Sequence, residues 1–447
     1  MGRHPSRRHV SPEEAPAGHR IRARRRELGL TQAELAGEEY TKSFISQLES
    51  GSAEPSLDTL RFLGRRLQLG LSTMAGDDTD QRLSLLAGLL SWAERAAGLD
   101  PDAARRALGL AQEIAREGGA ETYAADALLR LADLEMHAGA LDRAAAHVLD
   151  AAGYAGAPGS RIAARVALAG GRLALRRGDP AAAMPAFLQA AGTARRTVRH
   201  PDVAVEALIG LAACCVEQRD LRQARRRLQS AVTLAARHHL PSHGRALIRL
   251  AMVDGLTGRV ADALTSLRRA NDLLAGAADQ RDRIDALLGI GLLLLERGET
   301  RDAAHALGEA RDLARRLGEP SRECDVAIAQ ARAALAVADV DAASRLVAEA
   351  RALSDGARSP STSARIDAVT GRVLSAQGRH AEAVGMLAGA LALIEAARTP
   401  GELAEAARAM GHSARASGDP DTAARHLALA ERVARARRPT PWLNDLA

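Results

Sequence analysis

The chain has 447 residues with a net charge of +6, and only 2% of its residues are aromatic. A single compact core is excluded by this length, so several domains or a repeat array are expected. Helices that pack through Ala and Leu need few aromatic rings, so the composition favours an all-α protein. We find no apolar segment long enough to span a membrane and no apolar signal core at the N-terminus. A cytoplasmic protein without membrane contact is therefore expected.

The positive charge is concentrated near the N-terminus. Residues 1–76 contain 12 basic and 9 acidic side chains, which is half of the net charge in one sixth of the chain. Nucleic-acid-binding surfaces are basic, so the first sixth is the segment most suited to meet phosphates. The excess is modest and does not establish DNA binding by itself.

Residues 1–17 are predicted to form a flexible basic arm. Arg3, Arg7 and Arg8 lie in it, and arms of this kind can enter the minor groove of DNA. Terminal segments without apolar periodicity are more often disordered when free. The sequence favours the second reading and leaves the first open.

Residues 18–76 are predicted to form a small domain of four or five short helices. The first helix ends near Gly29. Thr31 is a suitable N-cap for the second helix and forms a capping box with Glu34. Thr41 caps the third helix, and Ser56 or Asp58 opens the next one.

Several short motifs in this domain occur in register with one known family. They are Leu30-Thr31-Gln32, Glu34-Leu35-Ala36, Ile45-Ser46, Leu48-Glu49-x-Gly51 and Pro55-Ser56. In this arrangement the domain closely resembles the XRE (Cro/C1-type) helix-turn-helix family of transcriptional regulators. One departure is visible: the segment between Ala36 and Thr41 is one residue shorter than the family pattern and lacks its customary turn glycine.

The resemblance implies that the third helix lies in the major groove of double-stranded DNA. It assigns base contacts to Lys42, Ser43 and Gln47, and a phosphate contact to Gln32 at the start of the second helix. It also implies that Arg25 and Glu49 form a structural pair. The remaining candidates for DNA contact are Thr31, Thr41, Phe44, Ser46, Arg20 and Arg22.

Two of these assignments have a structural alternative. Phe44 is as suited to packing inside the domain as to touching a thymine methyl group. The arginines of the first helix, which include Arg20, Arg22 and Arg24, could equally form a solvated face. Ile45 and Leu48 are predicted to point into the core of the domain.

Residues 77–438 contain an internal repeat of about forty residues. Each unit has Ala, then a larger apolar residue four positions later, and usually Ala three positions after that, which lie on one helical face. The first alanines of successive units are 39 to 41 residues apart. They are Ala104, Ala144, Ala183, Ala224, Ala263, Ala303, Ala343, Ala383 and Ala423.

A glycine stands five residues before the first Ala in most units, where it suits the left-handed end of a helix. Arg219 and Ala338 occupy this place in two units. Asp and Pro follow in some units, as in Gly178-Asp179-Pro180, and can cap and open the next helix. Each unit is therefore predicted to be a helix, a tight turn and a second helix.

This spacing resembles the tetratricopeptide repeat (TPR), with helices longer than in the usual 34-residue unit. The resemblance implies an α-solenoid of about nine TPR-like hairpins, whose groove binds a signalling peptide or a protein in similar regulators. A single helix-turn-helix reads few base pairs, so we expect a homodimer on a two-fold operator. The tail, residues 439–447, contains Trp442, which could cover the open apolar end of the solenoid or join a partner, and the first role is favoured.

The sequence predicts neither an enzyme nor a cofactor or metal site. Cys214 and Cys215 lie in an apolar helical pattern and are expected to be buried thiols. His238, His239 and His243 have no cysteine or carboxylate at ligand spacing. No nucleotide-binding loop, zinc-protease motif or nucleophile elbow is present.

The sequence therefore predicts a bacterial, sequence-specific DNA-binding transcriptional regulator. Its TPR-like solenoid would mediate dimerisation and sense a peptide, a small molecule or a protein partner. The alternative is a TPR interaction scaffold whose N-terminal domain is vestigial or binds DNA without specificity, an interpretation that the shortened turn favours. A solenoid that only dimerises or contacts RNA polymerase is a third reading.

Overall fold

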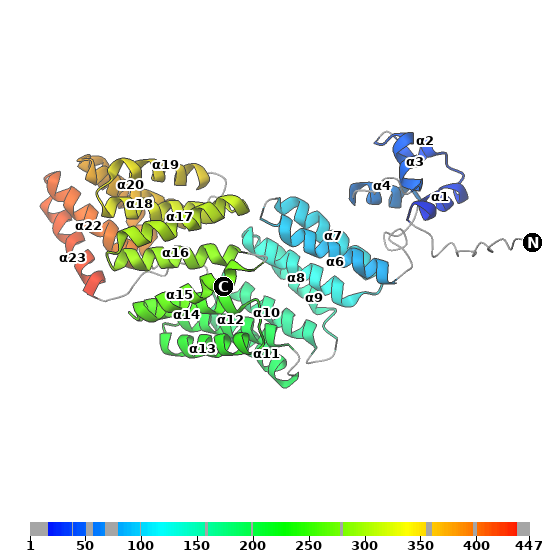
Figure 1. Cartoon of the computed structure of the whole chain (residues 1–447), viewed down its shortest axis with the longest axis horizontal. Helices are drawn as coiled ribbons and strands as arrows, with labels where there is room; N and C mark the ends of the chain where they lie inside the picture. The colour runs from blue at the N-terminus through cyan, green and yellow to red at the C-terminus, as the bar shows by residue number, and fades with distance from the viewer. Residues whose placement is uncertain are drawn as a thin grey trace, which may run out of the picture. The chain divides into compact units, whose positions relative to one another are not determined.

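The computed structural model describes residues 17–37, 39–50, 57–67, 79–98, 100–156, 160–197, 200–277, 280–354, 360–396 and 400–435. Every regular element in these ranges is an α-helix, which confirms the all-α fold class (Figure 1). The chain divides into two compact units, Met1–Arg177 and Gly178–Ala447. Residues 1–16 of the predicted arm, the predicted helix start at Ser56, and Trp442 lie outside the described residues, whereas Ala17 already belongs to a helix.

The N-terminal domain, predicted as residues 18–76, is called the head below, and it contains four described helices. They are α1 (Ala17–Glu27), α2 (Gln32–Ala36), α3 (Lys42–Ser50) and α4 (Leu57–Leu67). The helix ends follow the predicted signals. The Glu34 N–H donates to Thr31 Oγ1 at 3.1 Å while the Thr31 N–H donates to the Glu34 carboxylate at 2.6 Å, so the capping box is confirmed. Gly29, just after α1, has a φ of 70°.

After the head, first and second helices of hairpins alternate along the chain. The first helices are α6 (Thr79–Ala96), α8 (Glu121–His137), α10 (Arg161–Arg176), α12 (Pro201–Glu217), α14 (His243–Leu256), α16 (Arg281–Glu296), α18 (Pro320–Ala336), α20 (Pro360–Ala376) and α22 (Pro400–Ala416). The second helices are α7 (Pro101–Glu117), α9 (Leu141–Ala152), α11 (Pro180–Thr197), α13 (Leu221–Arg237), α15 (Val260–Ala275), α17 (Thr300–Leu317), α19 (Val340–Ser354), α21 (His380–Ala396) and α23 (Pro420–Arg435).

The repeated alanines bring the paired helices together. The first alanine of every unit lies in a second helix and is at most 1% exposed. The larger residue that follows packs over a small residue of a first helix. A Cβ atom added to Gly291 would come within 2.6 Å of the Leu307 side chain, and one added to Gly371 within 2.5 Å of Leu387. Small residues in both helices therefore permit the close approach that the sequence predicted.

The turns inside the hairpins have the predicted left-handed residue. Gly258 and Gly378 both have a φ of 77°. Arg219 and Ala338, which replace glycine, adopt the same conformation with a φ of 61°. The turn geometry is therefore kept even where a Cβ atom makes it unfavourable.

Aspartates after these turns cap the second helices. The side chains of Asp179, Asp220 and Asp419 accept hydrogen bonds of 2.9–3.0 Å from the backbone N–H three residues later. α11 begins at Pro180 and α23 at Pro420. The cap and the first-turn proline are thus confirmed at these units.

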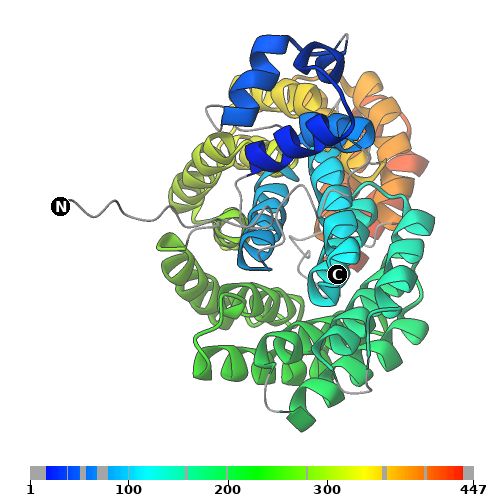
Figure 2. The same ribbon diagram turned by 90° about the vertical axis from the view of Figure 1, so that its right-hand side faces the viewer.

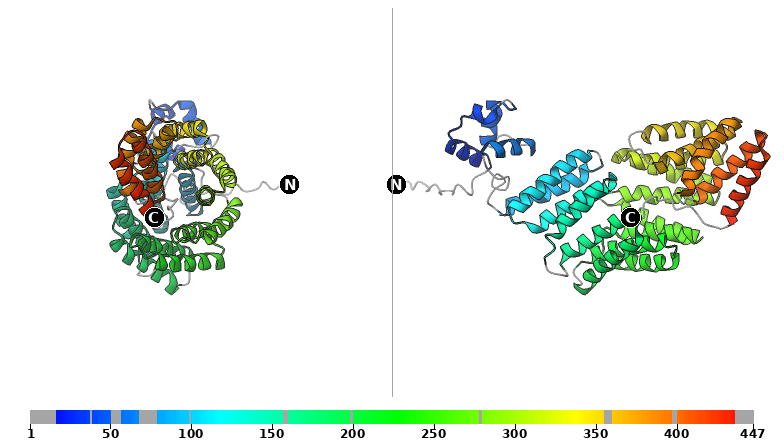
Figure 3. Two further views of the ribbon diagram at one scale, coloured as in Figure 1. Left: turned by 90° about the vertical axis from the view of Figure 1, so that its left-hand side faces the viewer. Right: turned by 180° about the vertical axis from the view of Figure 1, so that it is seen from behind.

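Within the second compact unit, Gly178–Ala447, the helices follow a curve, which Figure 2 shows from green to red. Neighbouring first helices pack on one another from α12 through α22, and the second helices from α13 to α21 each pack on the first helices before and after them. Figure 3 shows the hairpins of this unit side by side from behind. The first helices therefore occupy the inner side of the curve.

The two adjacent cysteines of α12 are buried thiols, as predicted. Cys214 and Cys215 are free and buried, and burial raises the pKa of Cys214 to about 11. A thiol with such a pKa is inert at neutral pH.

In the described part of the chain, no helix combines the length and apolar character that a membrane crossing needs.

Candidate DNA-binding site

The head is held together by one small apolar core. Ile21 of α1, Leu35 of α2, Ile45 and Leu48 of α3, and Leu63 of α4 are at most 2% exposed. All four described helices contribute, so the direction of α3 is fixed by packing on the other three. The predicted inward positions of Ile45 and Leu48 are confirmed.

A buried ionic hub connects α1, α2 and α3. Arg25 donates two hydrogen bonds to the Glu49 carboxylate, at 2.5 and 3.0 Å, and the Gln32 amide donates to the same carboxylate at 2.8 Å. Burial would raise the pKa of Glu49, but the bonds from Arg25 and Gln32 outweigh it and lower the pKa. Glu49 therefore remains charged and fixes the three helices that present the polar surface.

Gln32 has a structural bond in addition to its predicted phosphate contact. Its amide nitrogen carries two hydrogens, and the bond to Glu49 uses one of them. The side chain is partly buried and is oriented by that bond. The predicted phosphate contact stays a prediction, and Glu49 is the residue that would position it.

Two other arginines of the head have structural partners. Arg24 donates to the Leu67 carbonyl oxygen at 3.2 Å and to Glu27 at 2.9 Å. Arg66 donates to the Glu34 carbonyl oxygen at 2.7 Å, and its guanidinium lies over the Phe62 ring. Both arginines bridge helices of the head, a role that the sequence analysis did not assign.

The turn between α2 and α3 contains a glycine, although not at the place expected for the family. Gly37 has φ 60° and ψ −147°, and its N–H donates to the Ala33 carbonyl oxygen. A Cβ atom here would come within 2.6 Å of the Arg66 guanidinium. The customary turn position thus has no glycine, as the sequence indicated, but Gly37 ends α2 directly and supplies a positive φ at the start of the segment.

An aromatic cluster follows this turn. Tyr40 stacks on Phe44 with 5.4 Å between ring centroids, and meets Phe62 edge to face at 5.1 Å. Thr59, which is buried, donates a hydrogen bond to the Tyr40 hydroxyl oxygen. Phe44 is half-buried in this cluster, an arrangement that favours its packing role over contact with a thymine. Tyr40 anchors α3 and was missed by the sequence analysis.

The opposite face of α3 is polar and exposed. Lys42, Ser43, Ser46 and Gln47 are all exposed and follow one another at helical spacing along one side. Thr41, also exposed, caps the helix by accepting a hydrogen bond of 3.2 Å from the Phe44 N–H. The structure thus brings the predicted base-contacting residues together on one surface.

The remaining predicted residues belong to α1 and to the N-cap of α2. Thr31 caps α2 and is exposed, and Arg22 is exposed on α1. Arg20 belongs to α1, but its side chain lies outside the described residues. The polar face of α3 and Arg22 are therefore the described groups suited to meet DNA.

The first helices of the hairpins carry a second polar feature, which we call the charged column. One position, eighteen residues before the first alanine of each unit, is charged in eight consecutive units. The residues are Asp126, Arg165, Glu206, Arg245, Asp285, Asp325, Arg365 and Glu405. Acidic and basic residues alternate along this column except at Asp285 and Asp325, so neighbouring units present opposite charges to each other.

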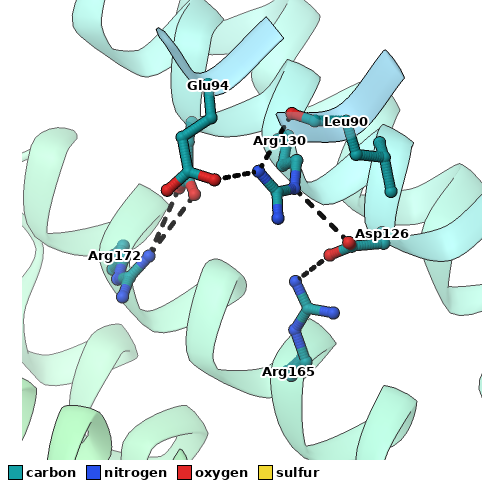
Figure 4. A network of polar contacts seen from close by, with 7 residues as sticks. Leu90, Glu94, Asp126, Arg130, Arg165 and Arg172 are labelled. Carbon is teal, nitrogen blue, oxygen red and sulfur yellow. Dashed lines mark hydrogen bonds and ion pairs between the residues drawn. The ribbon is translucent and has the colours of Figure 1, made fainter. Parts of the chain in front are cut away.

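In the first compact unit, Met1–Arg177, polar side chains at and beside the charged column join α6, α8 and α10 (Figure 4). Asp126 accepts from Arg130 at 3.3 Å and is also bonded to Arg165 of the next first helix. Arg130 donates to Glu94 of α6 at 2.8 Å, and its pKa is raised because these carboxylates outweigh its burial. Side chains from three successive first helices are thus linked.

In the second compact unit, Gly178–Ala447, similar ion pairs connect neighbouring first helices, and the last carboxylate of the column bonds arginines from two different helices. Arg245 bonds Glu206 at 3.1 Å, and Arg322 bonds Asp285 at 3.0 Å. Glu405 of α22 is bonded to Arg372 of α20. It also accepts two bonds, at 2.9 and 3.1 Å, from Arg332 of α18, which lies two hairpins earlier. One carboxylate therefore ties three successive first helices.

Comparison with known families identifies the head. Residues 21–73 match the family model described as "Helix-turn-helix", HTH_3. This agrees with the predicted XRE-type resemblance and assigns a helix-turn-helix DNA-binding domain to the N-terminal part of the chain. No curated protein sequence matches the chain closely enough to count as a relative.

Several solved structures share the fold over most of the chain. A Rap protein complexed with Competence and Sporulation Factor matches with a TM-score of 0.57, 11% identity, and coverage of 79% of this chain and 98% of the other. The quorum sensor NprR from B. thuringiensis, in its apo form, matches with a TM-score of 0.53, 12% identity, and coverage of 78% and 98%. At such identities the comparison shows the fold, a TPR-like helical solenoid.

Proposed function

We propose that the protein is a sequence-specific DNA-binding transcriptional regulator whose solenoid senses a signal. The observation that carries the proposal is the exposed polar face of α3, held outward by the buried pair of Arg25 and Glu49. The helix-turn-helix match supports this use of the face. In such domains the recognition helix enters the major groove and reads base edges.

The proposed contacts divide into two kinds. Lys42 and Gln47 would read bases, since Lys donates to guanine acceptors and Gln pairs with adenine. Ser43 and Ser46 lie beside them, with Phe44 packing beneath. Thr31, Gln32, Thr41, Arg20 and Arg22 would position the backbone through phosphates, without reading sequence.

A gel-shift titration on the DNA upstream of the protein's own gene tests this division. Lys42→Ala or Gln47→Ala should each lower specific affinity about 5- to 150-fold, while binding to unrelated duplex changes little. Arg22→Ala should weaken binding to all sequences alike and reduce the salt slope by about 0.9. Thermal melting of each variant controls for folding.

The same titration separates the regulator from its rival. If wild-type binding is weak, erased by salt and equal for every sequence, the head is vestigial and the chain is an interaction scaffold. If binding is specific and depends on Lys42 and Gln47, the scaffold reading fails. Affinity that rises with half-site pairing, together with a dimer mass in sedimentation, would identify the homodimer on a two-fold operator.

We further propose that the signal binds on the inner side of the curve, at the first helices. The similar structures include a quorum sensor and a Rap protein complexed with Competence and Sporulation Factor. The charged column links neighbouring first helices on this side, so a ligand bound there would meet side chains whose pairing depends on the spacing of these helices. A peptide that prefers one spacing of the first helices would favour one conformation of the dimer. The two heads of that conformation would fit the operator better or worse than those of the other, so the peptide would change the affinity for DNA.

A further inference from the structure

One outer helix of the solenoid has a composition unlike the others. α13 contains five arginines and no acidic residue: Arg222, Arg225, Arg226, Arg227 and Arg237. Among the described second helices, only α11 also lacks acidic residues, and each of the others contains at least two. A general preference for arginine in the chain does not explain this, because the second helices other than α11 and α13 also contain carboxylates.

The arginines of α13 differ in their surroundings. Arg225 is structural, since it bonds the buried Asp254 of α14 at 2.6 Å. Arg222, Arg226 and Arg237 are exposed, and no described residue forms an ion pair with them. Three uncompensated charges on one outer face are therefore available to a partner.

The three exposed arginines form a stripe along the helix. Arg222 and Arg226 are one turn apart, and Arg237 lies about 22 Å from Arg222 along the axis. Gln229 and Thr233, both exposed, lie between them on the same side. The nearest acidic residues in sequence, Glu217 and Asp220, precede the helix, and Asp220 is engaged as its N-cap. The stripe itself is uniformly basic.

We propose that this stripe, Arg222, Arg226 and Arg237, binds the phosphate backbone of duplex DNA. A row of guanidinium groups matches a partner with closely spaced negative charges, and arginine forks bind phosphate oxygens in a bidentate manner. The inference rests on the proposed function, because the head would hold DNA at high local concentration for the solenoid. The stripe would add affinity without reading sequence.

This inference adds a second phosphate-binding segment to the N-terminal sixth, which the charge distribution indicates as the part most suited to meet phosphates. Residues 77–447 have a net charge of +3. Because α13 alone contributes five positive charges, the rest of that region is slightly acidic. The five charges of α13 thus exceed the net charge of the whole region.

The test compares two triple variants that remove the same charge. The first is Arg222→Ala, Arg226→Ala and Arg237→Ala on α13. The control is Arg268→Ala, Arg301→Ala and Arg345→Ala, which are exposed on α15, α17 and α19. Both are measured in the full-length protein on a duplex of random sequence, at several salt concentrations.

The α13 variant should bind the random duplex about tenfold more weakly than the control variant, with a salt slope smaller by up to about 2.7. Equal affinities and slopes for the two variants would overturn the proposal. So would a loss of binding to poly-glutamate by the α13 variant with unchanged duplex binding, because the partner would then be an acidic protein surface.

The random duplex keeps this test separate from that of the head. If the wild type shows no sequence preference but the α13 variant still binds duplex more weakly than the control, the stripe stands and the specific regulator fails. If Lys42→Ala and Gln47→Ala abolish specificity while the two triple variants behave alike, the head reads DNA and the stripe does not bind it.

Discussion

The head and the solenoid both use arginine–carboxylate pairs, but they distribute them differently. In the head, Glu49 receives Arg25 and Gln32 and joins α1, α2 and α3 at one buried point. Within each compact unit of the solenoid, the charged column links successive first helices through several such contacts. The head therefore depends on one carboxylate, whereas the solenoid spreads the same interaction over many units.

The difference follows from topology. A small globular domain has one core, so a single buried charge can contact most of its helices, as Glu49 joins three of the four described ones. A repeat array has only neighbour contacts, and its stability is approximately a sum over units and interfaces. Loss of one pair should consequently unfold the head but only loosen a few hairpins of the solenoid.

Glu49→Ala is expected to have the largest effect. It leaves Arg25, whose side chain is 10% exposed, without its buried partner. Breaking a buried pair in this way costs about 3–5 kcal/mol, which is comparable to the whole stability of a small domain. Hydrogen exchange should show α1 to α3 unprotected while the solenoid stays protected, and specific DNA binding should disappear.

Glu27→Ala is the matched control for that experiment. Glu27 pairs with Arg24 on the same helix but is 62% exposed. An exposed pair contributes about 0–1 kcal/mol, so the head should remain folded. If Glu49→Ala and Glu27→Ala destabilised the head equally, the hub would have no special role.

Glu405 provides the corresponding test in the solenoid and a pH dependence. Burial alone would raise the pKa of Glu405, but Arg332 and Arg372 outweigh it and lower the pKa to about 2. Because the folded pKa lies below the ordinary value near 4.5, this stabilisation is complete above pH 4.5 and is lost as the pH falls toward 2. Urea unfolding between pH 6 and 3 should show this loss in the wild type.

Glu405→Gln should remove that part of the acid dependence and lower the free energy of unfolding by about 2–3 kcal/mol, less than a fully buried pair. Hydrogen exchange should increase in α18, α20 and α22 and leave the head unchanged. An unaltered pH profile, or an effect spread over the entire chain, would contradict a local three-helix bridge.

Much of the fold could be predicted because its signals are local. The spacing of alanines, the turn glycines and the aspartate caps each act within one hairpin, so the sequence shows them directly. The capping box of Thr31 and Glu34 is equally local. The polar face of α3 followed from the same reasoning, because helical periodicity separates Ile45 and Leu48 from Lys42 and Gln47.

The missed features depend on contacts between distant segments. Arg24 and Arg66 donate to backbone carbonyl groups, which carry no sequence signature. The bond from Gln32 to Glu49 requires the relative positions of α2 and α3. The charged column was visible at its forty-residue spacing, but its sign alternates, so a search for a repeated residue type passes over it.

Ala338→Gly is expected to have the smallest effect, and it opposes the others in sign. Ala338 has a φ of 61°, where most units have glycine. A left-handed residue with a Cβ atom is strained, so glycine should stabilise the protein by about 0.5–1 kcal/mol after its own entropy cost. Gly378→Ala is the mirror control, because its added Cβ would meet no atom within 4 Å and only the backbone strain changes. Shifts of the urea midpoint in opposite directions are expected, and a destabilising Ala338→Gly would refute the assigned strain.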